Sequence, residues 1–318
     1  MTMRKVYFID TVHPILKERL SKNNFECIDA TKLSREEIEK LIPDAYGIVI
    51  RARFTMNDDF LNRSENLRFI ARSGSGLENI DQSYCKERGI VLFNSPEGNR
   101  NAVAEHALGM LLVLLNKLNL ADAQVRNGVW NREGNRGEEV DGKTIGIIGY
   151  GNNGSCFAKK LAGFDVKLMA YDKYKTGFGD HFVQECTLEA IFQQADVVSF
   201  HIPLNKETKY FANEQFFNSF QKPIRLLNLA RGKIVNTKDL VDALKAGKVK
   251  GACLDVLEFE TKSFESFFEQ HLPDEFDYLI KSETVVLSPH VGGWTTESYF
   301  KLSNVLADKI LDWDKDDN

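Results

Sequence analysis

The chain has 318 residues, 43% of them hydrophobic and 27% charged, with a formal net charge of −5. This length favours about two domains, and the composition is typical of a soluble globular protein. The small negative charge, without a basic block, gives no electrostatic support for nucleic-acid binding, and the longest apolar run, 107–115, is too short to span a bilayer.

The cysteines and the N-terminus indicate a compartment. Five cysteines are scattered singly, without metal or redox spacing: Cys27, Cys85, Cys156, Cys186 and Cys253. Such usage suits a reducing compartment, where we expect each to be a small buried apolar residue. The N-terminus leads directly into a predicted strand, without a signal-peptide hydrophobic region. We therefore expect a cytoplasmic protein with no metal site.

The first third of the chain alternates strands and helices. Strands are predicted over 6–9, 47–50, 67–71 and 90–93. Ser34, followed three residues later by Glu37, predicts a capping box for a helix that ends near Leu41. This alternation indicates a parallel sheet with helices on both faces.

Polar residues follow two of these strands. Arg51 and Arg53 come after 47–50, and a Ser-Gly-Ser-Gly loop over 73–76 comes after the next strand. Ligands of parallel sheets gather at the carboxyl ends of the strands, so both are candidate binding elements. Two alternatives stay open: the arginines are solvated on a surface loop, and the glycine-rich loop is only a turn.

A long apolar helix is predicted over 102–118, buried between the two domains, with Glu105 in its first turn, where the helix dipole favours negative charge. His106 is interpreted as a core or capping histidine rather than a catalyst. The polar stretch 119–142 is expected to protrude as an arm. Trp130 there either anchors a subunit contact or packs within its own chain.

The centre of the chain carries a dinucleotide-binding pattern. A predicted strand over 144–148 is followed by Gly149, Gly151 and Gly154 in G-x-G-x-x-G spacing, then a helix over 156–161 and a strand over 166–171. The first glycine allows a tight turn, the second admits the pyrophosphate, and the third lets the helix pack closely on the strand. Free N–H groups at the helix N-terminus then face the phosphates.

Asp172 closes the second strand of this unit. Its carboxylate suits the adenosine ribose hydroxyls and would repel a 2′-phosphate, which favours NAD over NADP.

Further strands are predicted over 197–201, 225–229, 251–256 and 285–287, and Thr237 is predicted to cap a helix that Gly247 ends. Arg231, Glu260 and His290 each lie just past one of these strands. A histidine suits proton transfer near neutral pH, a carboxylate beside it fixes the ring tautomer, and an arginine holds a substrate carboxylate in a bidentate manner. Each is ordinary alone, but their shared position favours a catalytic set.

Residues 47–313 resemble the D-2-hydroxyacid dehydrogenase family, and most of all its D-3-phosphoglycerate dehydrogenase branch. The resemblance rests on an ordered set of stretches: GIVIRAR, RSGSGLENID, NSPEGNRNAVAEHALGMLL, NGVW, GKTIGIIGYGNNG, HIPLNKET, NLARGKIVN, GACLDVLEFE and VVLSPHVGG.

The resemblance implies an α/β fold of two doubly wound parallel-sheet domains. A Rossmann NAD-binding domain over 98–292 would be inserted into a flavodoxin-like substrate domain formed by 1–97 and 293–318. It also implies closure of a cleft and a homodimer formed through the arm.

The resemblance further implies roles for single residues. His290 would be the acid/base paired with Glu260, rather than with Glu258, and Arg231 would bind substrate. Asp255 would orient the nicotinamide carboxamide. The implied cofactor contacts are Ser75, Gly149, Gly151, Asn152, Asn153, Gly154, Asp172, His201, Ile202, Pro203, Leu229, Ala230, Asp255, Gly292 and Gly293. The implied substrate contacts are Arg51, Arg53, Gly74, Ser75, Gly76 and Arg231, with Arg51 on a substrate phosphate and Arg53 assisting.

The sequence departs from the family pattern in four places. Asn152 and Asn153 stand where an Arg-Ile pair is usual, which predicts weaker cofactor binding. Thr261 replaces a proline, and the segment 261–283 is long and rich in phenylalanine (Phe264, Phe267, Phe268, Phe276), as in the D-lactate dehydrogenase branch. Trp294 replaces a small residue and is expected to reshape the substrate pocket. We expect no C-terminal regulatory domain and no serine feedback through one.

These features predict an NAD-dependent oxidoreductase of D-2-hydroxy acids, with 3-phosphoglycerate as the leading substrate. An unphosphorylated acid, such as lactate, glycerate or a larger one, is the alternative substrate. An NAD-sensing binding protein that works through protein contacts is the alternative from another class. The complete set of Arg231, Glu260 and His290 argues against it.

Overall fold

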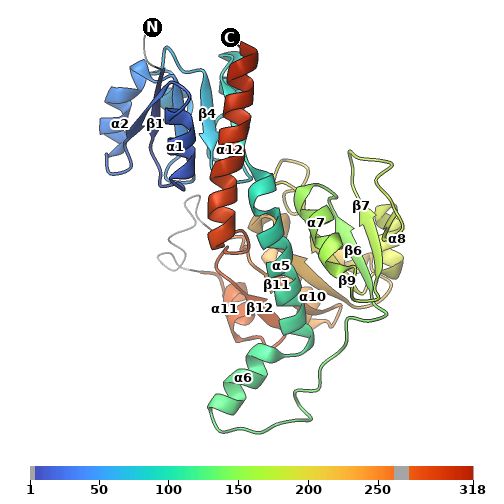
Figure 1. Cartoon of the computed structure of the whole chain (residues 1–318). Helices are drawn as coiled ribbons and strands as arrows, with labels where there is room; N and C mark the ends of the chain where they lie inside the picture. The colour runs from blue at the N-terminus through green and yellow to red at the C-terminus, as the bar shows by residue number, and fades with distance from the viewer. Residues whose placement is uncertain (1–3, 261–271, 318) are drawn as a thin grey trace. The chain divides into compact units, whose positions relative to one another are not determined.

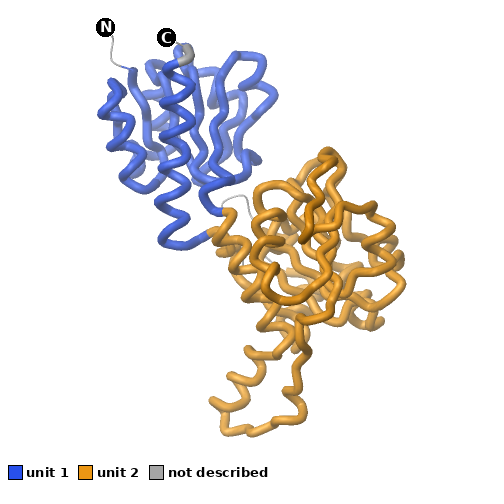
Figure 2. Tube along the Cα trace, turned by 45° about the vertical axis from the view of Figure 1, so that its right-hand side comes forward, with its two compact units in different colours: residues 1–99, 261–265, 294–318 blue, residues 100–260, 266–293 orange. Residues whose placement is uncertain are grey.

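The computed structural model describes residues 4–260 and 272–317. They form two parallel sheets in two compact units, which Figure 2 colours separately. Unit 1 contains the described residues up to Asn99 and from Trp294 onward. Unit 2 contains Arg100–Glu260 and the described residues from 272 up to Gly293. The α/β class with two parallel sheets is therefore confirmed.

The sheet of unit 1 has five parallel strands in the order β2-β1-β3-β4-β5, which is the flavodoxin-like order. The strands are β1 Arg4–Phe8, β2 Phe25–Asp29, β3 Gly47–Ile50, β4 Phe69–Arg72 and β5 Val91–Asn94. The helical segments are α1 Ile15–Ser21, α2 Arg35–Leu41, η1 Ile42–Asp44, α3 Asp58–Leu61, α4 Gln82–Glu87 and α12 Thr296–Asp317 (Figure 1).

Alternation along β1 sends side chains to two separate cores. Val6 and Phe8 pack in a cluster with residues of α1 and α12, whereas Tyr7 packs in a cluster with residues of α2, α3 and α4. A sheet apolar on both faces needs cover on both, and the C-terminal α12 supplies part of it with Leu306 and Ile310, which are fully buried.

The sheet of unit 2 has seven parallel strands in the order β12-β11-β10-β9-β6-β7-β8. The strands are β6 Thr144–Ile148, β7 Lys167–Tyr171, β8 Val183–Glu185, β9 Val197–Phe200, β10 Ile224–Asn228, β11 Val249–Leu254 and β12 Val285–Leu287. The helical segments are α5 Pro96–Leu115, whose first four residues belong to unit 1, α6 Leu118–Arg126, α7 Asn152–Leu161, α8 Leu188–Gln194, α9 Glu214–Asn218, η2 Gly232–Ile234, α10 Thr237–Lys245 and α11 Asp274–Lys281.

Neighbouring residues of β6 again belong to different cores. Ile147 packs in a cluster with α5 and α7, whereas Ile148 packs in a cluster with α8, α9, α10 and α11. Burial on both faces explains why these strands read as continuous apolar runs. Of the phenylalanines noted in the segment 261–283, Phe276 is buried in α11; Phe264, Phe267 and Phe268 lie outside the described residues.

Helix α5 begins six residues earlier than predicted. It starts at Pro96, a favoured first helical residue, and the acidic residue of its first turn is Glu97. The placement of Glu105 in the first turn is therefore wrong: Glu105 lies mid-helix and accepts a 2.8 Å hydrogen bond from Lys160 Nζ. The helix ends at Leu115, and Lys117 takes a left-handed conformation (φ 51°) before α6 begins.

The predicted arm over 119–142 begins one residue earlier, with helix α6 at Leu118. The arm, residues 118–142, contains this helix and a loop that projects from the rest of unit 2 (Figures 1 and 2). The sequence predicted the projection but not the helix. Trp130 is 78% exposed, so it does not pack within its own chain. Among the described residues no single helix is long and apolar enough to cross a membrane. Only α5 and α6 taken together, across a 62° bend, reach that length and composition.

One of the two helix caps predicted from residue type is present, and the other lies one residue away from the predicted position. The capping box of Ser34 and Glu37 is present, as predicted. The predicted cap of α10 is wrong: the Asn236 side chain accepts the hydrogen bond from Asp239 N, and Thr237 is already helical. Gly247 follows that helix with φ +71°, as expected of a glycine terminator.

All five cysteines are free. Cys85 and Cys253 are buried, as expected, but Cys27, Cys156 and Cys186 are only half-buried.

Candidate active site

The glycine loop between β6 and α7 has the geometry that a pyrophosphate requires. Gly149 has φ +94°, and a Cβ there would lie 2.7 Å from the carbonyl oxygen of His201. At Gly154 a Cβ would lie 2.0 Å from the Gly149 oxygen, so the helix can start this close to the strand only with glycine. A Cβ at Gly151, the N-cap of α7, would meet nothing within 4 Å. Space is thus left open where the second glycine admits a pyrophosphate, and these residues fit a dinucleotide.

The two asparagines that depart from the family pattern begin α7. Asn152 and Asn153 occupy its first turn, where free backbone N–H groups attract anions. The side-chain oxygen of Asn153 is buried and has no hydrogen-bond partner among the described residues. It is an acceptor that a cofactor hydroxyl or a water would satisfy.

Asp172, directly after β7, is tied to the glycine loop. Its carboxylate accepts hydrogen bonds from the backbone N–H groups of Tyr150 (2.8 Å), Tyr174 (2.9 Å) and Lys175 (3.1 Å). These three donors fix the carboxylate beside the glycines, at the position where dinucleotide-binding units hold the adenosine ribose.

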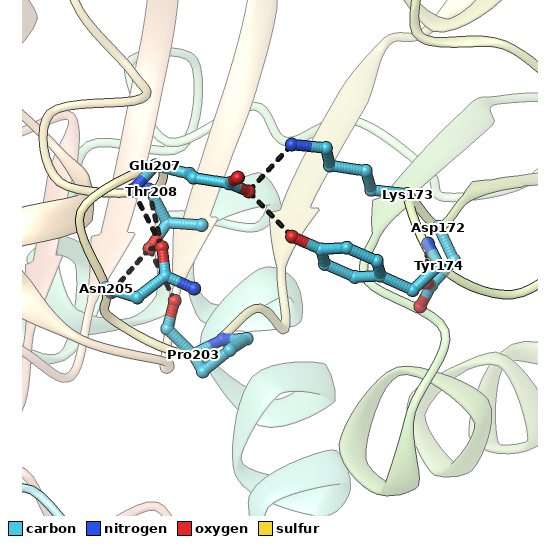
Figure 3. A network of polar contacts seen from close by, with 7 residues as sticks. All are labelled: Asp172, Lys173, Tyr174, Pro203, Asn205, Glu207 and Thr208. Atoms are coloured by element: carbon cyan, nitrogen blue, oxygen red, sulfur yellow. Dashed lines mark hydrogen bonds and ion pairs between the residues drawn. The ribbon is translucent and has the colours of Figure 1, made fainter. Parts of the chain in front are cut away.

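The predicted cofactor residues after β9 border the same loop. Burial lowers the pKa of His201 to about 4, so its ring is neutral at physiological pH. The ring shares a hydrogen bond of 2.9 Å with Ser199 Oγ. Ile202 lies beside Gly149, and the Pro203 oxygen accepts a 2.6 Å hydrogen bond from Thr208 Oγ1 (Figure 3).

Leu229, Ala230 and Arg231 form the turn that leaves β10. The Arg231 carbonyl accepts a hydrogen bond from Asn228 Nδ2 (2.9 Å), and its guanidinium donates to the Ala230 carbonyl (2.7 Å). The next residue, Gly232, approaches the backbone of Leu257 so closely that a Cβ would lie 1.9 Å from its oxygen. This contact brings the turn of Arg231 against the segment that leads to Glu260.

His290 and Glu260 form a direct pair. Nδ1 of His290 lies 2.8 Å from Oε2 of Glu260, and both side chains are largely buried. The other carboxylate oxygen accepts a hydrogen bond from Leu257 N, which orients the glutamate. Glu258 is engaged elsewhere, by the Tyr210 hydroxyl (2.7 Å) and Thr237 N (2.9 Å). Of the two glutamates, the structure thus brings only Glu260 to the histidine.

Asp255 holds the turn that carries His290. The buried carboxylate accepts hydrogen bonds from Ser288 Oγ (2.7 Å), Val291 N (2.9 Å) and Gly292 N (2.8 Å). Its backbone oxygen accepts a 2.7 Å hydrogen bond from His290 N, and His290 has the left-handed φ of 56°. A non-glycine residue in that region needs such support from its surroundings.

His106 joins the same network, with Nε2 2.9 Å from Ser288 Oγ and 3.5 Å from Asp255 Oδ1. It is therefore neither a core nor a capping histidine. Sequence reasoning did not single out Ser288, although the stretch SPHVGG contains it. Gly293, the last of the predicted cofactor residues, ends unit 2.

Apart from Arg231, the predicted substrate residues lie in unit 1, after β3 and β4. The Asp10 carboxylate accepts backbone hydrogen bonds from Arg51 (3.0 Å), Ala52 (3.0 Å) and Arg53 (3.1 Å) and so fixes the turn of the arginines. The Arg53 guanidinium donates to the carbonyls of Ile9 (2.9 Å) and Leu33 (2.6 Å), which gives it a structural role. Asp10 lies two residues past the end of β1, but its partners are 41–43 positions away in sequence, so sequence reasoning missed it.

Arg51 stacks on an aromatic ring. Its guanidinium carbon lies 4.1 Å from the ring centre of Trp294, a residue that is 62% exposed. In the neighbouring Ser-Gly-Ser-Gly loop, Ser75 Oγ donates to Asn99 Oδ1 (2.7 Å), and the Ser75 carbonyl accepts from Asn94 Nδ2 (2.6 Å). A Cβ at Gly74 would lie 2.0 Å from the Arg72 guanidinium. Gly76 lies in the same loop. Because Ser75 and Gly74 make these contacts, the loop is a packed element rather than a free turn.

Comparison with known proteins agrees with this architecture. Residues 108–292 match the family model of the D-isomer specific 2-hydroxyacid dehydrogenase, NAD binding domain. The chain is 33% identical to a D-3-phosphoglycerate dehydrogenase of Archaeoglobus fulgidus over 95% of its own length, but spans only 56% of that relative. It is 31% identical to a hydroxypyruvate reductase of Thermotoga maritima, covering 96% of this chain and 97% of the relative.

A solved structure of D-lactate dehydrogenase from Aquifex aeolicus, complexed with NAD and lactic acid, superposes with a TM-score of 0.82 at 25% identity. The match covers 99% of this chain and 96% of that one. The matched range includes the glycine loop, Asp172, Arg231, Asp255, Glu260 and His290. The chain belongs to the family of D-isomer specific 2-hydroxyacid dehydrogenases, and the match to the family's NAD-binding domain lies within unit 2.

Proposed function

We propose that this protein is an NAD-dependent dehydrogenase of a D-2-hydroxy acid. The observation that carries the proposal is the 2.8 Å pair of His290 Nδ1 and Glu260 Oε2 after strands β12 and β11. With Nδ1–H donated to the carboxylate, the lone pair of Nε2 takes the hydroxyl proton of the substrate. Arg231 holds the substrate carboxylate. When bound, the nicotinamide supplies the acceptor for the hydride that leaves C2.

The two units would bind different ligands. Unit 2, with the glycine loop and Asp172, would bind the cofactor, and Asp255 would contact the nicotinamide carboxamide as well as supporting His290. Unit 1 would bind substrate through Arg51 and through the loop of Ser75 and Gly76. In the terms predicted from sequence, residues 98–292 would be the cofactor domain, 1–97 and 293–318 the substrate domain, and a cleft would close on substrate.

The leading substrate is 3-phosphoglycerate. It is favoured by the A. fulgidus relative and by Arg51, a cation at the carboxyl end of β3 that could meet a phosphate. The second candidate is an unphosphorylated acid such as glycerate, whose ketoacid is hydroxypyruvate. It is favoured by the T. maritima relative, which this chain matches over 97% of the relative's length.

A steady-state assay of NADH absorbance would test both. The purified protein would be given 3-phosphohydroxypyruvate, hydroxypyruvate, pyruvate and 2-ketoglutarate in parallel. Preference for the phosphorylated ketoacid supports the first substrate, and preference for hydroxypyruvate supports the second. Failure to turn over any of the four, with NADH still bound, would contradict the catalytic proposal and favour an NAD-sensing binding protein.

Two variants separate mechanism from specificity. His290→Ala should abolish turnover while NADH binding survives, because the ring provides the proton acceptor. Arg51→Ala should raise KM for a phosphorylated substrate specifically. Arg63→Ala makes the same charge change elsewhere in unit 1, where an exposed arginine pairs with the largely buried Glu39, and serves as the control.

We further propose a homodimer formed through the arm. Its apolar side chains Leu118, Val125, Val129 and Trp130 are all exposed in the single chain and suit a subunit contact. The measurement is light scattering of the wild type and of Trp130→Ser. A monomeric wild type would refute the proposal. A cytoplasmic location is proposed on the five free cysteines.

A further inference from the structure

One glutamate links the loops that follow β7 and β9. Oε2 of Glu207 accepts a hydrogen bond from Lys173 Nζ (2.7 Å) and another from the Tyr174 hydroxyl (2.6 Å), as Figure 3 shows. Lys173 and Tyr174 come directly after Asp172, the residue predicted to face the adenosine ribose. The ion pair therefore lies at the adenosine end of the candidate cofactor site.

Both loops are built to hold these side chains. On the β9 side, Asn205 Oδ1 accepts hydrogen bonds from the N–H groups of Glu207 (2.8 Å) and Thr208 (3.0 Å). On the β7 side, the Asp172 carboxylate accepts from the N–H groups of Tyr174 and Lys175. Side-chain acceptors thus fix the backbone at each end of the contact, and Figure 3 shows those of Asn205. This favours a defined ion pair over a chance contact between surface side chains.

Both members of the ion pair, Lys173 and Glu207, are charged at neutral pH. The hydrogen bond to Glu207 raises the pKa of Lys173, and the hydrogen bond from Lys173 lowers the pKa of Glu207 below its usual range. The same carboxylate raises the pKa of Tyr174, which keeps the hydroxyl protonated as a donor.

A dinucleotide-binding unit selects its cofactor at this position. An acidic residue at the end of the second strand suits the ribose 2′-hydroxyl of NAD, whereas the 2′-phosphate of NADP needs a cation nearby. Lys173 is a cation next to that acidic residue. A free ammonium there could accept a 2′-phosphate and offset the repulsion from Asp172, but in this structure it is paired with Glu207.

We propose that Glu207 is a cofactor-specificity residue, which holds Lys173 away from a 2′-phosphate and so completes the discrimination against NADPH that Asp172 begins. The inference rests on the proposed use of a nicotinamide dinucleotide, not on which acid is oxidised. Since Lys173 and Glu207 are 55% and 54% exposed, their pairing adds little to stability, and its removal leaves the fold intact.

Binding measurements on three variants test this without any turnover. The affinities for NADH and NADPH, and for the fragments 5′-AMP and adenosine 2′,5′-bisphosphate, would be measured by titration calorimetry on the full chain. Glu207→Gln should bind NADPH and the bisphosphate about three- to tenfold more tightly, with affinity for NADH and AMP changed less than about twofold. The double variant Lys173→Met/Glu207→Gln should lose that gain.

Asp242→Asn is the matched control, because Asp242 forms an ion pair of 2.8 Å with Lys238 on α10 and loses the same charge when substituted. Its affinities should equal those of the wild type. Unchanged NADPH affinity in Glu207→Gln would overturn the proposal, as would a gain that persists in the double variant, because Lys173 would then not be the group released. Binding of neither NADH nor NADPH by the wild type would instead contradict the proposed function itself.

Discussion

The glycine loop makes a quantitative prediction, because two of its glycines are required for different reasons. In Gly154→Ala the new Cβ would lie 2.0 Å from the Gly149 carbonyl oxygen and 3.2 Å from an Ile147 methyl group. The first neighbour is backbone and cannot rotate away, so the helix must shift. Overpacking of this kind lowers the free energy of unfolding by up to about 3 kcal/mol. The higher helix propensity of alanine raises it by about 1 kcal/mol relative to glycine.

The net destabilisation is therefore about 2 kcal/mol. For a cooperative unit of about 150–250 residues, such as unit 2, this lowers Tm by roughly 4–8 °C, measured by circular dichroism without cofactor. Gly151→Ala should behave differently, because its Cβ would meet nothing within 4 Å. We expect less than about 1 kcal/mol lost in stability. Affinity for NADH should nevertheless fall at least about tenfold, because the methyl group occupies the approach of the pyrophosphate.

Gly163→Ala is the control for both, since a Cβ there would also meet nothing within 4 Å and the residue lies past the far end of α7. It should keep both Tm and NADH affinity. The reasoning is refuted if Gly154→Ala melts within about 1 °C of the wild type, or if Gly151→Ala binds NADH as tightly as the wild type does.

Three further outcomes follow from the site. Glu260→Gln replaces the anionic partner of His290 Nδ1 and should lower kcat about 10- to 100-fold with NADH affinity within about twofold; an unchanged kcat would remove Glu260 from the mechanism. Trp294→Ser removes the ring that lies 4.1 Å from the Arg51 guanidinium, a contact worth about 0.5–1 kcal/mol, and should raise KM for the ketoacid about two- to fivefold without affecting NADH affinity. His201, whose pKa is lowered to about 4 by burial, binds its proton more readily in the unfolded chain, so the folded state loses stability as pH falls from about 6.5 towards 4. Between pH 7 and pH 5 this amounts to about 2 kcal/mol. Denaturant unfolding of His201→Gln should lack that part of the pH dependence, and equal slopes in both proteins would contradict the assignment.

Local pattern was sufficient for the elements that depend on neighbours in sequence. The strand over Gly47–Ile50 is predicted with the same bounds as in the structure, because a run of four apolar residues between polar turns is typical of a short buried strand. The capping box of Ser34 and Glu37 is equally local, since both hydrogen bonds close within three residues.

Predictions failed where two local solutions compete. Asn236 and Thr237 are both good cap residues, and only the backbone of the folded chain shows that Asn236 is the extended one. The start of α5 was placed too late because its first turn, Pro-Glu-Gly-Asn, is polar. The glycine in this turn is explained by packing inside unit 1. A Cβ at Gly98 would lie 2.6 Å from the Leu302 backbone of α12, so only glycine lets the two helices approach this closely.

Sequence pattern alone predicted most of the strands, the glycine loop and the family, because these depend on periodicity and on short spacings. It missed the strands β2 (Phe25–Asp29) and β8 (Val183–Glu185) and the helix α6. It also named Glu260 and His290, but not the Asp255 and Ser288 network behind the histidine or the Glu207 bridge beside Asp172. Those contacts join residues that are far apart in the sequence. Asp255 is 33 positions from Ser288 and 36 from Val291, and Glu207 is 33 positions from Tyr174 and 34 from Lys173. Only the parallel sheet, which brings the carboxyl ends of successive strands to one edge, makes them neighbours.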